Sequence, residues 1–77
     1  MNNAAYRDFF LGLTHQHLGE KKLSLAACYL TIAAGFDALI EVGSQEPHPS
    51  AFEPDLWPVI DLELVINGQP PLFRKHY

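Results

Sequence analysis

The chain has 77 residues, a net charge of −4 and a hydrophobic content of 48%. This length allows a single small domain, residues 1–77, whose own core would supply only about 3–5 kcal/mol. The excess apolar material predicts either an unusually apolar surface patch or burial against another chain, and we favour the second, most simply in a homodimer. Seven acidic residues and no basic residue lie between Leu23 and Phe73, so the chain lacks the basic surface that direct nucleic-acid binding requires.

Residues 3–18 are predicted to form a first helix, because apolar residues recur there at steps of three and four. Asn2 or Asn3 can cap its N-terminus, and Gly19 is suited to end it. The main stripe consists of Tyr6, Phe9, Phe10, Leu13 and His17. The polar linker over residues 19–22 is so short that the next helix must pack against this one in the antiparallel sense.

Residues 22–42 are predicted to form a second helix, which is the centre of the fold. Residues 23–36 contain no charge, and Gly43 follows where a left-handed glycine would end the helix. The large apolar residues at helical spacing are Leu25, Cys28, Tyr29, Ile32, Phe36, Leu39 and Ile40. The core of the hairpin is therefore expected where Phe9, Phe10 and Leu13 meet Leu25, Tyr29, Ile32 and Phe36.

A second side of this helix carries small residues at helical spacing. Ala27, Thr31, Ala34 and Ala38 would let another helix approach closely, and Gly35 beside them costs the helix roughly 1 kcal/mol relative to alanine. We predict that this side is a helix-packing or dimer face. Its partner is either residues 59–66 of the same chain or another copy of the chain.

The hairpin resembles one unit of the tetratricopeptide repeat family over about thirty residues. The similar positions are the Leu11–Gly12 pair, Gly19 in the turn, and Ala26 or Ala27 in the second helix. The alanines come one or two residues late, and no proline closes the unit at the expected distance. The resemblance implies a helical hairpin and no more.

The connection over residues 43–58 contains four prolines, which exclude a regular helix across it. Ser50 and Glu53 match a helix capping box, so a short helical turn is expected there. Phe52 and Trp57 either hold this segment on the core or form an exposed contact for a partner, since aromatic residues dominate binding hot spots.

Residues 58–66 fit two structures. The alternation of Ile60, Leu62, Leu64 and Ile66 with other residues favours a strand, and Asn67–Gly68 is a turn signal. Pro58 at the start and Gly68 past the end also fit a helix. A lone strand would have no partner in this chain, so we favour a short third helix.

No residue pattern in the chain predicts catalysis, a cofactor or a metal site. His15 and His17 would point about 200° apart on a helix, so they cannot share one metal ion there. One is expected to be exposed and the other to lie at the rim of the helix pair. Cys28 is the only cysteine and is expected to be an inert thiol on the apolar face. The serines lack a nucleophile motif, and no glycine-rich phosphate loop is present.

Asp37 and Glu41 form an acidic pair near the C-terminal end of the second helix. Both their mutual repulsion and the helix dipole disfavour this arrangement, by about 0.3–1 kcal/mol each. A nearby cation would relieve it, and Arg74 and Lys75 of the same chain or of a partner are the candidates. We therefore predict that this acidic end is a docking point.

These features predict a small acidic module that acts by binding a protein, as an adaptor, a chaperone-like subunit or an inhibitor; a basic partner would suit its charge. The alternative is a structural homodimeric subunit of a larger complex without a separate target, and a small enzyme or metal-binding protein comes third. The uncharged run falls short of the about 20 residues of a membrane span. The first residues do not match a signal peptide, so we expect the protein in the cytoplasm.

Overall fold

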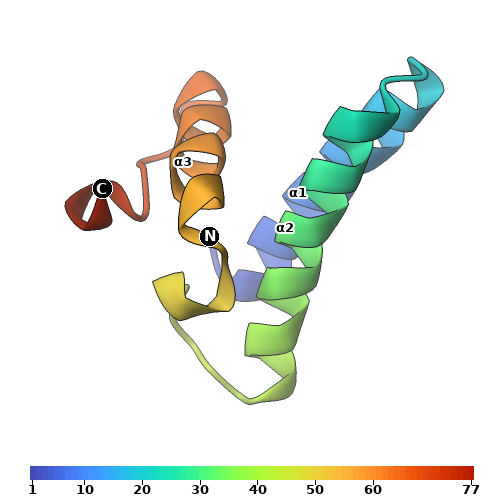
Figure 1. Ribbon diagram of the computed structural model, residues 1–77. Helices are drawn as coiled ribbons and strands as arrows, with labels where there is room; N and C mark the ends of the chain where they lie inside the picture. The colour runs from blue at the N-terminus through green and yellow to red at the C-terminus, as the bar shows by residue number, and fades with distance from the viewer. The chain divides into compact units, whose positions relative to one another are not determined.

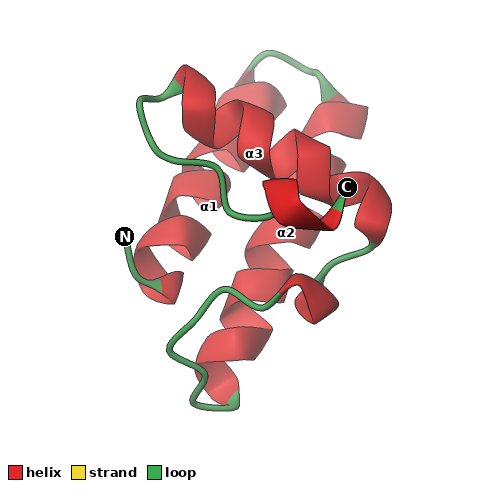
Figure 2. Ribbon diagram, turned by 90° about the vertical axis from the view of Figure 1, so that its left-hand side faces the viewer, coloured by secondary structure: helices red, strands yellow, loops and turns green.

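The structure, a computed structural model, describes residues 1–77 as helices and loops without a strand (Figure 1, Figure 2). It confirms the predicted mostly α fold, with a helical hairpin, a proline-rich connection and a short third helix. The chain divides into two compact units, Met1–Pro47 and His48–Tyr77. That the whole chain acts as a single domain stays a prediction.

Helix α1 spans Asn3–Gly19 and begins at the predicted cap. The side-chain oxygen of Asn2 accepts a hydrogen bond of 2.8 Å from the backbone N–H of Ala5. Asn3 has a different role, because its buried side-chain amide donates to the carbonyl oxygens of Ser44 (3.1 Å) and Glu46 (3.2 Å). The loop after the second helix is thereby held at the start of α1.

Helix α2 spans Leu23–Glu41 and ends as the sequence predicts. Gly43 has a positive φ of 74°, and the N–H of Ser44 reaches back to the carbonyl of Leu39 at 2.9 Å. This is the left-handed glycine termination, which pairs a carbonyl that the helix itself leaves unsatisfied. The buried residues of α2 are Ala26, Tyr29, Ile32, Ala33, Phe36 and Leu39.

Aromatic contacts between α1 and α2 confirm the antiparallel hairpin seen in Figure 1. An early residue of α1 meets a late residue of α2, since the rings of Tyr6 and Phe36 stack at 5.2 Å. A late residue of α1 meets an early one of α2, since His17 stacks on Tyr29 at 5.1 Å. Between them, Phe10 is fully buried and stacks on both Phe36 (5.9 Å) and Tyr29 (6.2 Å).

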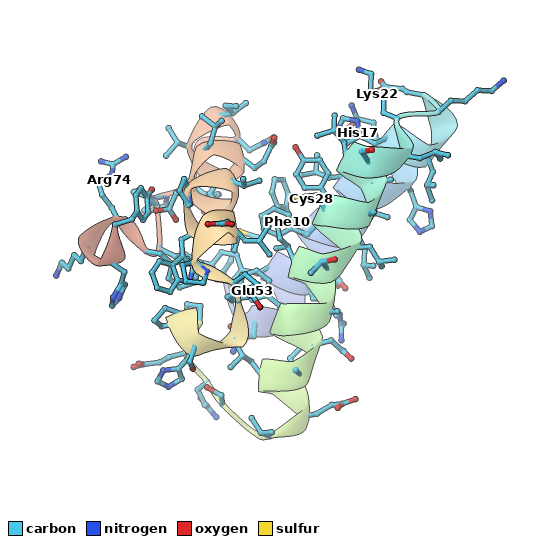
Figure 3. All side chains as sticks on the ribbon, in the orientation of Figure 1. Phe10, His17, Lys22, Cys28, Glu53 and Arg74 are labelled. Carbon is cyan, nitrogen blue, oxygen red and sulfur yellow. The ribbon has the colours of Figure 1, made fainter.

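The turn between the helices contains a strained residue that the sequence did not reveal. Helix α1 ends at Gly19, as predicted, but the residue with left-handed backbone is Lys21, with φ 60°. Its N–H donates to the carbonyl of Leu18, and that of Lys22 donates to the carbonyl of His17 at 2.8 Å. Figure 3 shows His17 and Lys22 together at this end of the hairpin. A lysine in this conformation costs about 1–2 kcal/mol, a cost that glycine avoids.

Lys21→Gly is therefore expected to stabilise the protein by about 0.5–1 kcal/mol, because relief of the strain exceeds the added entropy of the unfolded chain. The midpoint of thermal unfolding, followed by circular dichroism, should rise by about 3–6 °C. Lys22→Gly removes the same charge from a residue with φ −92° and should give no such gain. Equal shifts in the two variants would contradict the assignment of strain to Lys21.

The second unit begins with two short 3-10 helices, η1 (Pro49–Ala51) and η2 (Pro54–Leu56). A helical turn does form where the capping box was predicted, but it begins at Pro49 and has no side-chain cap. Helix α3 then spans Trp57–Ile66, so the strand alternative was wrong. A helix satisfies its own backbone hydrogen bonds, whereas an isolated strand does not. Gly68, with φ 78°, ends α3, and η3 (Arg74–His76) closes the chain.

Candidate functional site

One side of α2 is uncovered, and we call it the open face; its residues are Ala27, Leu30, Thr31, Ala34 and Ala38. All five are exposed, so the four small residues predicted as a packing face are accessible. Leu30 is 51% exposed and is the one large apolar residue among them. Near the two ends of α2, Leu23 and Val42 are exposed as well. The open face is therefore mainly apolar from Leu23 to Ala38, and the exposed Glu41 lies at its C-terminal end.

A groove of about 440 Å³ runs beside the open face, between α1 and α2. Its residues are Arg7, Asp8, Leu11, Leu30, Ala33, Ala34 and Asp37. Leucine and alanine side chains make up the apolar part, while the three charged residues gather at one end. A shallow apolar groove with a charged end suits an apolar side chain of a partner better than a polar metabolite.

Arg7 organises the charged end of the groove. Its Nη1 lies 3.2 Å from the carboxylate of Asp37, and its Nε lies 3.1 Å from that of Asp8. The hydrogen bonds to Asp8 and Asp37 raise the pKa of Arg7 above its ordinary value, so the guanidinium stays charged at all accessible pH. One positive charge thus faces two negative ones at the mouth of the groove.

Arg7 is the cation near Asp37 that sequence reasoning missed. The prediction considered Arg74 and Lys75, which are exposed on η3 in the second unit, and their pairing with Asp37 and Glu41 stays a prediction. The antiparallel register of the hairpin could have revealed the pair of Arg7 and Asp37. Tyr6 lies beside Phe36, so the neighbouring Arg7 is level with Gly35, and its long side chain spans the short distance to Asp37. Glu41 is exposed at the end of α2.

Phe52 and Trp57, the predicted aromatic contacts, belong to a cluster within the second unit. Phe52 is buried and its ring lies 5.6 Å from that of Phe73. Trp57 packs on Phe73 at 6.5 Å and on His76 at 5.7 Å, and its indole N–H donates to the carbonyl of Pro49 at 3.0 Å. This arrangement is the one expected of aromatic residues that close a small core.

Asp61 is a buried carboxylate that fixes the end of the chain and that sequence reasoning passed over. It is 2% exposed and accepts hydrogen bonds from the N–H groups of Leu72 (2.8 Å) and Phe73 (3.1 Å) and from the hydroxyl of Tyr77 (2.8 Å). The position of Asp61 could have revealed its burial, because Asp61 lies with Ile60 on the buried side of α3. Its role is structural, since all its bonds go to the chain itself.

The bond between Tyr77 and Asp61 predicts a pH dependence. The hydrogen bond to the carboxylate raises the pKa of Tyr77 above its ordinary value of 10. A raised pKa in the folded state means that the stabilisation is fully present below pH 10 and is lost as the pH rises through the higher, folded-state pKa. In urea unfolding, the stability difference between the wild type and Tyr77→Phe should be constant from neutral pH to about pH 9 and shrink above pH 10. A difference that is unchanged across the tyrosine titration would contradict this assignment.

The remaining ionisable side chains do not gather into a reactive site. No three His, Cys, Asp or Glu side chains lie close enough together to hold a metal ion. His15 is exposed, and His17 is at the rim of the helix pair, stacked on Tyr29 with its Nδ1 3.3 Å from the carboxylate of Glu20. Burial raises the pKa of the Cys28 thiol, which disfavours the reactive thiolate at neutral pH.

By length and composition alone, α2 could cross a membrane, although core helices of soluble proteins also meet that criterion. No known protein family, no curated protein and no solved structure matches this chain. The open face of α2 is the apolar surface with a groove of about 440 Å³ beside it, while α3 also exposes Leu62, Val65 and Ile66.

Proposed function

We propose that the protein acts by binding a protein through the open face of α2 and the adjoining groove. The observation that carries this proposal is Leu30, which is half exposed beside Ala27, Thr31, Ala34 and Ala38 in the middle of the apolar central helix. Apolar surface of this kind on a small protein marks a site where another molecule binds. The small residues would let a partner helix approach closely, and the groove would receive its side chains.

The charge distribution supports a protein as the ligand. Seven acids and no basic residue lie between Leu23 and Phe73, so a nucleic acid would be repelled. A partner with basic residues around an apolar centre would complement Asp37 and Glu41 at the end of the face. An adaptor, a chaperone-like subunit or an inhibitor would act in this way, and we place the protein in the cytoplasm, since its one cysteine cannot form an internal disulfide.

The second candidate is a structural role as a homodimeric subunit without a separate target. The second unit favours this structural role, because Asp61 and the aromatic cluster make their hydrogen bonds and ring contacts with residues of the chain itself. In both candidates the open face of α2 is covered by protein. They differ in whether the covering chain is another copy or a different protein.

Photo-crosslinking in the native host tests the proposal. A benzophenone-bearing residue in place of Leu30 should give specific protein adducts, and the same residue in place of Leu62 serves as the control. Leu62 is 59% exposed on α3, so it matches Leu30 in type and accessibility but lies outside the open face. The same adducts at both positions, or adducts with lipid alone at Leu30, would contradict protein binding through α2.

A further inference from the structure

We propose that the partner of the open face is a second copy of this chain, bound antiparallel so that Leu30 of each copy enters the groove of the other. This inference rests on the proposed function, that the open face binds protein, and of the two candidates it favours the one in which the covering chain is another copy. It starts from the groove, whose apolar part is formed by Leu11, Leu30, Ala33 and Ala34. A leucine side chain occupies a fraction of its volume of about 440 Å³, so the exposed Leu30 of a second copy has room to enter.

The spacing along α2 makes the face complementary to itself. Ala27, Thr31, Ala34 and Ala38 follow one another at steps of four, three and four, which is the same sequence of steps in either direction. A two-fold axis perpendicular to α2, midway between Thr31 and Ala34, therefore sets the row against its own copy. Each Ala27 lies at the level of the other copy's Ala38, and each Thr31 at the level of the other copy's Ala34.

The same axis brings the exposed leucine to the groove. Leu30 and Ala34 lie on the same edge of the open face, on opposite sides of the axis. In the antiparallel pair, Leu30 of one copy is level with Gly35 of the other, about 1.5 Å along the helix from Ala34. Because Ala34 lines the groove and is small, it leaves the space that Leu30 fills, and the symmetry repeats this contact twice.

Charge decides between the antiparallel and the parallel arrangement. The turn before α2 carries Lys21 and Lys22, the latter paired with Glu20 at 3.3 Å, and the end of α2 carries Glu41 and Asp37, the latter paired with Arg7. An antiparallel pair places the basic end of each copy beside the acidic end of the other and sets the two helix dipoles in opposite directions. A parallel pair would place Glu41 against Glu41 and make the dipoles repel, which is unfavourable.

The open face must extend over most of α2 to support such a dimer. A stable interface buries about 800 Å² per partner, which is roughly one sixth of the 4821 Å² surface of this chain. The open face extends along the 19 residues of α2, about 28 Å at 1.5 Å per residue. Exposed Leu23 and Val42 near the ends of the helix extend the apolar contact beyond the small residues.

Disulfide cross-linking of the purified chain tests the geometry, with Cys28→Ser in every variant. Two copies of Ala34→Cys would be separated by three residues along the helix, about 4.5 Å, and should oxidise to a covalent dimer. Two copies of Ala27→Cys or of Ala38→Cys would be separated by eleven residues, about 16 Å, and should stay monomeric on reducing-agent-free gels. Equal cross-linking at all three positions, or none at Ala34→Cys, would overturn the antiparallel pair.

Light scattering provides a second test that separates this inference from the proposed function. Leu30→Glu should halve the mass while its circular dichroism stays helical, and the matched control Leu62→Glu should remain dimeric. A monomeric wild type that still gives adducts with another protein from position 30 would overturn the second copy and leave protein binding standing. The wild type could instead be a monomer that sediments with phosphatidylcholine–phosphatidylglycerol vesicles and loses this vesicle binding with Leu30→Glu. That result would overturn both the second copy and the proposed protein binding.

Discussion

Asp61→Ala is expected to cost about 3–5 kcal/mol and to release the C-terminal end of the second unit. The carboxylate accepts from the backbone N–H groups of Leu72 and Phe73 and from the hydroxyl of Tyr77. Hydrogen bonds to a charged group contribute about 1.5–3 kcal/mol each, and alanine would leave two backbone donors unsatisfied. A loss of this size equals the whole stability expected of so small a domain.

Urea unfolding followed by the fluorescence of Trp57, the only tryptophan, measures this effect inside the unit concerned. Asp61→Asn keeps one acceptor oxygen and should lose about half as much stability. Asp55→Ala removes an exposed carboxylate from η2 and should change the free energy of unfolding by less than about 0.5 kcal/mol. If Asp61→Ala were no less stable than Asp55→Ala, the carboxylate would not hold the end of the chain.

Phe10→Ala is the other change with a large expected effect, because Phe10 is fully buried at the centre of the aromatic stack. Truncation of a buried phenylalanine costs about 3–5 kcal/mol, and the lost ring contacts with Tyr29 and Phe36 add to the cost. The hairpin is expected to unfold at 25 °C or to come close to doing so. Far-UV circular dichroism should show a marked loss of helix.

Phe9 supplies the matched control, since it is the same residue type one position earlier and is only partly buried. Phe9→Ala should cost about 1–2 kcal/mol and leave the helix content unchanged. Phe10→Leu should recover part of the stability, because it refills much of the cavity. Equal losses for Phe9→Ala and Phe10→Ala would mean that Phe10 is not the centre of the hairpin.

The helices were predictable from sequence because their signals are local. Periodicity over residues 22–42 predicted α2, and Gly43 predicted its end. The pair Asn2 and Asn3 predicted the start of α1, where Asn2 is the cap. For the third helix, the sequence fitted a strand almost as well as a helix. The alternation over residues 58–66 fits a strand, but without a partner strand in the chain only a helix can satisfy the backbone.

The features that escaped prediction depend on contacts between residues distant in sequence. Arg7 pairs with Asp37 across 30 positions, which only the register of the hairpin determines. Asp61 is bound by donors 11 to 16 residues later, from a segment whose prolines gave no regular pattern. Lys21 was missed for another reason: Gly19 is the local signal for a turn, and the chain places the strained residue two positions later.

We expect a second copy of the chain to cover the open face of α2 in solution. Sedimentation equilibrium of the wild type over a concentration series measures this most directly. We predict a mass that approaches twice the 8.6 kDa of one chain, about 17 kDa, and that falls to the monomer value in Leu30→Glu but not in Leu62→Glu. A mass of one chain at every concentration, equal in all three proteins, would contradict it.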